Sequence, residues 1–281
     1  MRGRFDLPGS ATVTVGTAAA VAGIMAGQER GWTSARTSAL IATALVALLL
    51  FVLAERRAAV PLVPLSIFRI RSLALADTIS LLTGGVLPAT FFFLSLYFQQ
   101  TRGMGPLAAG LALLPRAVGL SLGAQLAPRL MERLTDRTVY FAGALLTVVG
   151  LAWLSRLDLD GGHMTGVFVP SFVAMAGFGL SGLPLTVAAT ADAGREQAGL
   201  ASGLLNASRQ IGGAVVLAAL VAVATAVTKA DSSGGDEAPV HGYGAALLVG
   251  AALVALAALL GLGLPRRARH SAPGEHHGVP T

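Results

Sequence analysis

Three polar side chains in an otherwise apolar stretch have the spacing of one helical face. Ser202, Asn206 and Arg209 carry a hydroxyl, an amide and a guanidinium, and they lie between Gly199 and Gly213 at steps of three and four residues. Such steps place residues on one side of an α-helix. The other positions are mostly Leu, Ala and Ile. The polar face must therefore meet another helix or a water-filled cavity rather than lipid.

Arg116 stands near the middle of another apolar segment, 107–131. A charge at that depth is costly unless it is paired or hydrated. In a central cavity, Arg116 could attract an anionic group or keep a nearby carboxylate ionised. A structural arginine, which binds backbone carbonyls or extends its head to the membrane surface, is the alternative.

Asp77 is the only acidic residue clearly within an apolar segment. A carboxylate that burial keeps protonated is a physically sensible proton carrier. Its depth also suits a residue at the membrane interface or a charge at the start of a helix. We therefore take Asp77, Arg116 and Asn206 as candidates for a substrate cavity or for coupling. The depths of Asp77 and Arg116 do not evidently match, so we make no claim of an ion pair between them.

Arg209 has a different expected place. It precedes the uninterrupted apolar run that begins at Ile211 and follows a polar hinge at Asp192 to Gln197. We expect it at the cytoplasmic interface, holding the hinge rather than touching a substrate. This is a gating or structural role.

The composition predicts an integral membrane protein. Hydrophobic residues make up 54% of the 281 residues and charged residues 12%, and the mean hydropathy is +0.71, far from the values of a soluble domain. The net charge of +6 comes from basic residues in short loops between apolar runs. Membrane topology explains this charge better than nucleic-acid binding does.

The sequence offers no sign of an enzyme. There is no cysteine, so disulfides and thiolate chemistry are excluded. The histidines lie in loops and the tail without a third ligand nearby, so we expect no metal site. No phosphate-binding glycine loop, no G-x-S-x-G, no H-E-x-x-H and no paired carboxylates are found. We predict no cofactor.

About twenty apolar residues are needed to cross a bilayer. This rule predicts a polytopic all-α protein with about eight spans. They fall roughly at 10–27, 37–54, 73–98, 107–131, 138–155, 166–190, 198–228 and 243–264.

The basic residues predict the orientation of these spans. Thirteen arginines lie in the terminal segments and alternate loops, against five basic residues in the other loops, with Arg116 and Arg209 left out. An excess of basic residues marks the cytoplasmic side. We expect both termini in the cytoplasm.

One stretch resembles the hallmark of a known family. It resembles the motif G-x-A-S-G-L-x-N-x-x-R-Q-x-G that follows a cytoplasmic hinge in the fourteen-helix drug:proton antiporters of the major facilitator superfamily. The positions that match are Gly199, Ala201, Ser202, Gly203, Leu204, Asn206, Arg209, Gln210 and Gly212. The segments PLVPLSIFRIRS and YFQQTRGMGPLAAGLALLP also look like that family.

The resemblance implies an organisation. Residues 1–60 look like the two central linker helices, 61–265 like the carboxy-terminal six-helix half, and the polar segment 266–281 is expected to be a disordered cytoplasmic tail. The loop from Glu55 to Ser72 would separate the first two parts. The family's first six helices have no counterpart in this sequence. We therefore expect the chain alone not to transport.

The resemblance also implies a function, the export of hydrophobic small molecules in exchange for protons across a bacterial plasma membrane. Its partners would be the bilayer, the substrate and a separate amino-terminal six-helix half, with no nucleic acid. Two alternatives stay open. One is a non-transporting membrane interaction or assembly protein derived from a permease, and the other is a carrier in which two copies of this chain supply both bundles.

Overall fold

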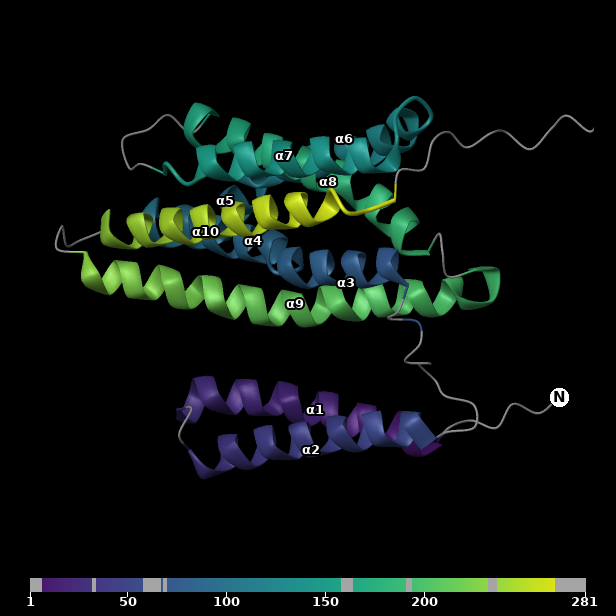
Figure 1. Ribbon diagram of the computed structural model, residues 1–281. Coiled ribbons are helices and arrows are strands. Elements are labelled where there is room, and N and C mark those ends of the chain that lie inside the picture. The colour runs from purple at the N-terminus through teal and green to yellow at the C-terminus, as the bar shows by residue number, and fades with distance from the viewer. Residues whose placement is uncertain are drawn as a thin grey trace, which may run out of the picture. The chain divides into compact units, whose positions relative to one another are not determined.

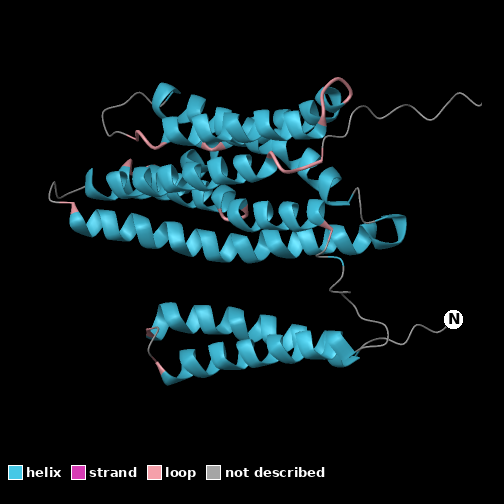
Figure 2. Ribbon diagram, viewed as in Figure 1, coloured by secondary structure: helices cyan, strands magenta, loops and turns pink. Residues whose placement is uncertain are grey.

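The described part of the chain is helical throughout. The computed structural model describes residues 7–31, 34–57, 67, 70–157, 164–190, 194–231 and 237–265. These residues form helices and short loops, with no strand among them (Figure 2). This confirms the all-α fold class. The chain divides into two compact units, Met1–Arg69 and Ile70–Thr281, and the division falls inside the loop that the sequence marks as a boundary.

The first unit is a helical hairpin. Helices α1 (Leu7–Arg30) and α2 (Ala35–Arg57) pack along each other. Gly31, at φ +89°, turns the chain between them, a conformation that glycine adopts without steric cost. Ser34 then caps α2, because its hydroxyl accepts a hydrogen bond from the Thr37 amide at 3.2 Å, and the Thr37 hydroxyl donates to the Gly31 carbonyl at 3.2 Å.

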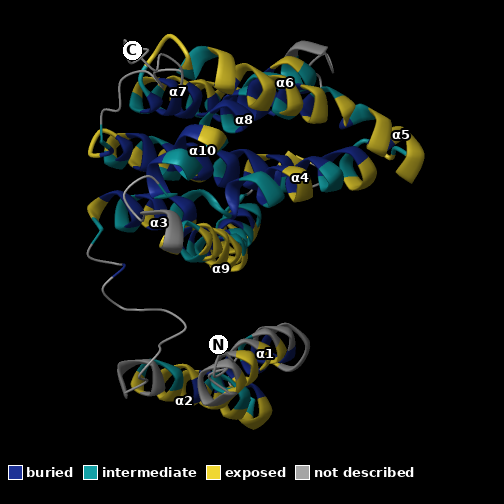
Figure 3. Ribbon diagram, turned by 90° about the vertical axis from the view of Figure 1, so that its right-hand side faces the viewer, coloured by how far each residue is buried: buried dark blue, intermediate teal, exposed yellow. Residues whose placement is uncertain are grey.

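The second unit is a bundle of helices (Figure 1). Its elements are α3 (Arg71–Thr83), α4 (Val86–Leu96), the π-helical turn η2 (Tyr97–Thr101), α5 (Pro106–Ala112), α6 (Leu114–Met131), α7 (Asp136–Leu154), the π-helical turn η3 (Met164–Phe168), α8 (Val169–Thr190), α9 (Gly194–Ala230) and α10 (Glu237–Gly261). Helix α8 packs on both α6 and α7, while α10 packs between α7 and α9, and α9 packs on α3. The core lies along α8 and α10 (Figure 3).

Seven helical segments in the described part are long and apolar enough to cross a membrane. They match seven of the predicted spans, with ends that differ by a few residues except at 237, where the last helix starts earlier. The remaining predicted span, 10–27, forms α1 and is not one of the seven. A span there stays a prediction. Large apolar side chains such as Leu111, Leu122, Leu145 and Leu259 are exposed on the bundle, as lipid-facing residues are.

Two spans are interrupted one turn before a proline. Helix α3 ends at Thr83 and α4 begins at Val86, so the break falls at Gly84 and Gly85. Pro88 has no amide hydrogen to donate to the Gly84 carbonyl, and its ring crowds that carbonyl. The same effect of Pro115 separates α5 from α6 at Leu113.

The helices approach so closely that glycine is required where they cross. A Cβ on Gly123 of α6 would overlap the carbonyl oxygen of Ala176 in α8, and one on Gly179 of α8 would overlap that of Leu120. Between α3 and α9, a Cβ on Gly212 would overlap the Leu81 carbonyl oxygen. Helices in lipid associate chiefly through van der Waals contact, which small residues permit.

The expected hinge and tail are only partly described. Residues 191–193 lie outside the described residues, and Gly194 to Gln197 form the first turn of α9. The last four residues of the expected hinge, Gly194 to Gln197, are therefore helical. The tail at 266–281 lies outside the described residues.

We predict that Gly123→Ala lowers the thermal unfolding midpoint of the chain in detergent, because the methyl group has no space at the α6–α8 crossing. Overpacking of this kind costs about 1–3 kcal/mol. Gly110→Ala is the matched control, since the structure has open space around Gly110, and alanine favours helix over glycine. Equal midpoints for the two variants would contradict the predicted close crossing.

Candidate functional site

The polar face of α9 is uncovered. Ser202, Asn206 and Arg209 are all exposed, and the positions around Gly199 and Gly203 are open. The Ser202 hydroxyl donates to the Ala198 carbonyl at 3.0 Å within its own helix. Among the described residues of the second unit, then, this face meets no other helix along most of its length. Its neighbour Gln210 is exposed as well, whereas Gly212 packs against α3.

Arg209 packs against the break between α3 and α4. Its carbonyl oxygen lies against Gly84, near the midpoint of the helical segment 71–101. Helix α9 has 37 residues and is about 55 Å long, well beyond the hydrocarbon core of about 30 Å, so the start of its apolar run does not by itself fix the depth of Arg209. The place of Arg209 at the cytoplasmic interface and its gating or structural role stay predictions.

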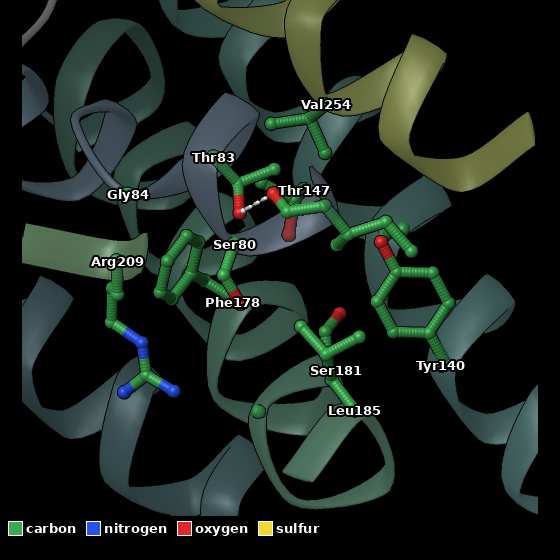
Figure 4. A pocket seen from close by; sticks show the side chains of 13 residues that line it. Ser80, Thr83, Gly84, Tyr140, Thr147, Phe178, Ser181, Leu185, Arg209 and Val254 are labelled. Carbon is green, nitrogen blue, oxygen red and sulfur yellow. Dashed lines mark hydrogen bonds between the residues drawn. The ribbon is translucent and has the colours of Figure 1, made fainter. Parts of the chain in front are cut away.

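Arg209 borders a small pocket inside the second unit (Figure 4). The pocket has a volume of about 70 Å³ and is bounded by α3, α7, α8, α9 and α10. The side chains that bring polar groups to its wall are Ser80, Thr83, Tyr140, Thr147, Ser181 and Arg209. Such a space holds a few water molecules at most.

Most of these hydroxyls are already donors to backbone carbonyls. Thr147 donates to Gly143 at 3.0 Å and Ser181 to Gly177 at 2.9 Å, and Tyr140 reaches Ala257 at 3.3 Å. Their oxygens can still accept hydrogen bonds. The pocket can therefore accept hydrogen bonds from a small polar guest, and Arg209 can donate them.

Asp77 and Ser80 are buried polar groups on the face of α3 that leads to this pocket. Asp77 is 7% exposed and Ser80 is 2% exposed. Both oxygens of Asp77 and the hydroxyl of Ser80 are without a hydrogen-bond partner among the described residues. Ser208 of α9 is close enough to act on the Asp77 carboxylate, but the geometry is not that of a hydrogen bond. Buried polar groups of this kind are costly and mark candidate sites.

Arg116 lies in a separate cavity. One terminal nitrogen, Nη2, donates to the Leu87 carbonyl oxygen at 3.3 Å and approaches the Met175 sulfur at 3.6 Å. The guanidinium carbon is 5.3 Å from the centre of the Phe91 ring, within range of a cation–π interaction. The second terminal nitrogen, Nη1, is buried and without a hydrogen-bond partner in the described part. The bond to Leu87 is the contact expected of a structural arginine, yet half of the guanidinium remains free.

The structure does not bring all the candidates together. No ion pair joins Asp77 and Arg116 within the described residues. Asn206 is exposed on α9 and is not among the residues that line either cavity. Ser80, Thr83, Tyr140, Thr147 and Ser181 were not singled out from the sequence. The sequence did contain a pattern that indicates the polar face of α3, because Asp77, Ser80 and Gly84 have the spacing of one helical face.

Comparison with known proteins identifies the family. The sequence profile described as Major Facilitator Superfamily matches residues 8–217. The chain belongs to the Major Facilitator Superfamily. Members of this superfamily are transporters rather than enzymes.

The most similar relatives include drug-export and resistance proteins. The chain is 37% identical to the cephamycin export protein CmcT of Amycolatopsis lactamdurans, over all of this chain and 57% of that protein. It is 31% identical to the uncharacterized MFS-type transporter EfpA of Mycobacterium tuberculosis, over 81% of this chain and 43% of the relative. It is 30% identical to the puromycin resistance protein pur8 of Streptomyces alboniger, over 92% of this chain and 53% of that protein. The resemblance to drug-export members is thereby confirmed.

The chain spans about half the length of these curated relatives. Together with the seven apolar helices, the relatives support a multi-pass protein of the bacterial inner membrane.

We predict that Asp77→Asn leaves the thermal unfolding midpoint unchanged or raises it by about 2–4 °C, because the amide removes a buried carboxylate that lacks a partner. The matched control is Asp136→Asn. Asp136 is equally buried, lies in the first turn of α7 and has an interaction partner, so its loss should lower the midpoint. A drop for Asp77→Asn as large as that for Asp136→Asn would show that the Asp77 carboxylate is stabilised by a partner.

Proposed function

We propose that this chain forms the carboxy-terminal part of a drug-export permease, which moves hydrophobic small molecules out of the cell in exchange for protons. The observation that carries the proposal is the uncovered polar face of α9 with Ser202, Asn206 and Arg209. A polar face is costly in lipid, so a second bundle is its natural partner. Membership of a transporter superfamily and similarity to export proteins support the same assignment.

The partner in this proposal is a six-helix amino-terminal segment. Alternating access needs two bundles that move against each other around a site near the midplane. The second unit supplies one such bundle. Its glycine crossings hold the α6–α8 and α3–α9 pairs rigidly, so each bundle would move as a body.

Proton exchange in this proposal uses Asp77. Its carboxylate is buried beside α9 without a hydrogen-bond partner in the described part. In such surroundings the neutral, protonated carboxyl group has a lower free energy than the carboxylate. Access of water to Asp77 in one arrangement of the two bundles would permit release of the proton, and exclusion of water in the other would favour the protonated form.

A transport experiment tests the function. The purified chain would be placed in lipid vesicles alone or co-assembled with the part of the cephamycin export relative that this chain does not match, and ethidium uptake would be followed under an imposed pH gradient. We expect uptake by the assembly and none by the chain alone. Uptake by the chain alone would favour a carrier made of two copies. Assembly without uptake of any substrate would favour a non-transporting interaction protein.

The orientation has its own test. We propose that both termini are cytoplasmic, which puts Gly105 outside and Leu134 inside. Since the sequence has no cysteine, the introduced cysteine is the only thiol that can be labelled in each of the single variants Gly105→Cys and Leu134→Cys. A membrane-impermeant maleimide should label Gly105→Cys in intact cells and Leu134→Cys only after permeabilisation. The reverse pattern would invert the proposed topology.

A further inference from the structure

Arg116 is a buried cation in a membrane-spanning helix, and only half of its guanidinium is used. Its side chain is 7% exposed. Nη2 contacts the Leu87 carbonyl and the Met175 sulfur, whereas the buried Nη1 is without a partner among the described residues. Arginine offers five N–H donors in a planar fork. The donors of Nη1 are therefore not used by any group in the described part of the protein.

The charge itself is also uncompensated. No carboxylate forms an ion pair with Arg116 in the part of the chain that the structure describes. The Phe91 ring and the Leu87 carbonyl stabilise a cation in part, but neither carries a negative charge. Buried charges in proteins are normally paired because an isolated one is costly. An anion that reached Arg116 would meet a site already organised for it.

A cavity opens next to this guanidinium. It has a volume of about 270 Å³ and lies between α4, α5, α6 and α8. Apart from Arg116, its lining is apolar and includes Phe91, Leu113, Leu120 and Met175. Such a space accommodates a flat apolar body, and the guanidinium provides the one charged end. This combination of an apolar wall and a few fixed polar groups is typical of small-molecule sites.

We propose that this cavity binds the carboxylate of an amphipathic substrate, with Arg116 as its anchor. The proposal rests on the proposed export function and specifies one substrate class for it, namely aromatic or aliphatic carboxylic acids in their ionised form. A monoanionic carboxylate fits the planar guanidinium fork. The apolar lining disfavours heavily hydrated phosphate groups, which would lose more hydration on entry. An acidic side chain from elsewhere in the protein is the other source of a carboxylate.

The test compares two molecules of the same shape and different charge. Equilibrium dialysis of the purified full chain in detergent would measure binding of 2-naphthoate and of the neutral 2-naphthamide, with protein-free micelles as blanks. We expect naphthoate to bind at least about tenfold more tightly than naphthamide, because the charged form makes charge-assisted hydrogen bonds. Equal affinities on the unaltered chain would overturn the proposal, and this comparison needs no variant to fold.

Variants then assign the preference to one residue. Arg116→Gln should reduce naphthoate affinity about tenfold or more and change naphthamide affinity much less, while Arg116→Lys should keep part of the preference. Arg129→Gln is the matched control, because Arg129 is exposed at the end of the same helix and loses the same charge. An unchanged preference in Arg116→Gln, or an equal loss in Arg129→Gln, would overturn the assignment.

Two further outcomes separate this proposal from the export function. If the unaltered chain binds neither probe, the anchor proposal fails. Ethidium uptake by the unaltered assembly would then still support export. If the assembly transports nothing while the chain retains its naphthoate preference, the export function fails and the anion site stands.

Discussion

Close contact between helix backbones is the constraint on which the bundle depends. In lipid every backbone polar group must be satisfied within the protein, so the chain is helical wherever it spans. The helices cannot then be driven together by exclusion of water, and they associate through van der Waals packing. Gly123 and Gly179 allow this between α6 and α8, and Gly84 and Gly212 allow it between α3 and α9. The side chains that line the cavities are held in place by these crossings.

The close packing also makes the buried polar groups unusual. A bundle packed this closely has little room for water, so each buried polar atom without a hydrogen-bond partner lowers the stability of the folded protein. Asp77 and Ser80 lie along one face of α3, and Arg116 bridges α4, α6 and α8. These groups lie in the second unit at breaks or crossings of helices rather than along its lipid-facing surfaces. Such a distribution suits a protein that handles protons or charged guests within its bundle.

Breaks in two of the membrane-spanning segments are a second feature of the bundle. Pro88 and Pro115 each remove one backbone hydrogen bond and end a helix one turn earlier, at Gly84 and at Leu113. The first break lies against α9 beside the small pocket, and the second lies on the wall of the Arg116 cavity. Discontinuous helices at binding sites are common in transporters, because freed backbone groups and local flexibility are useful there. In this chain the two breaks border the two cavities.

The sequence by itself determined the helical class, seven spans in the described part and the family, because apolar length and the glycine-polar motif at 199–212 are local properties of the chain. It also marked Asp77 and Arg116, since a charge inside an apolar run is visible without a structure. Only the tertiary structure decided which groups are left without partners and which line a common space. The contact of the Arg209 carbonyl with Gly84 depends on how α3 and α9 cross. The Nη1 of Arg116 without a hydrogen-bond partner depends on how α4, α6 and α8 cross, and the hydroxyls of Tyr140, Thr147 and Ser181 around one pocket depend on α7 and α8. Helix crossings are set by contacts between residues distant in sequence, and one-dimensional periodicity carries no record of them.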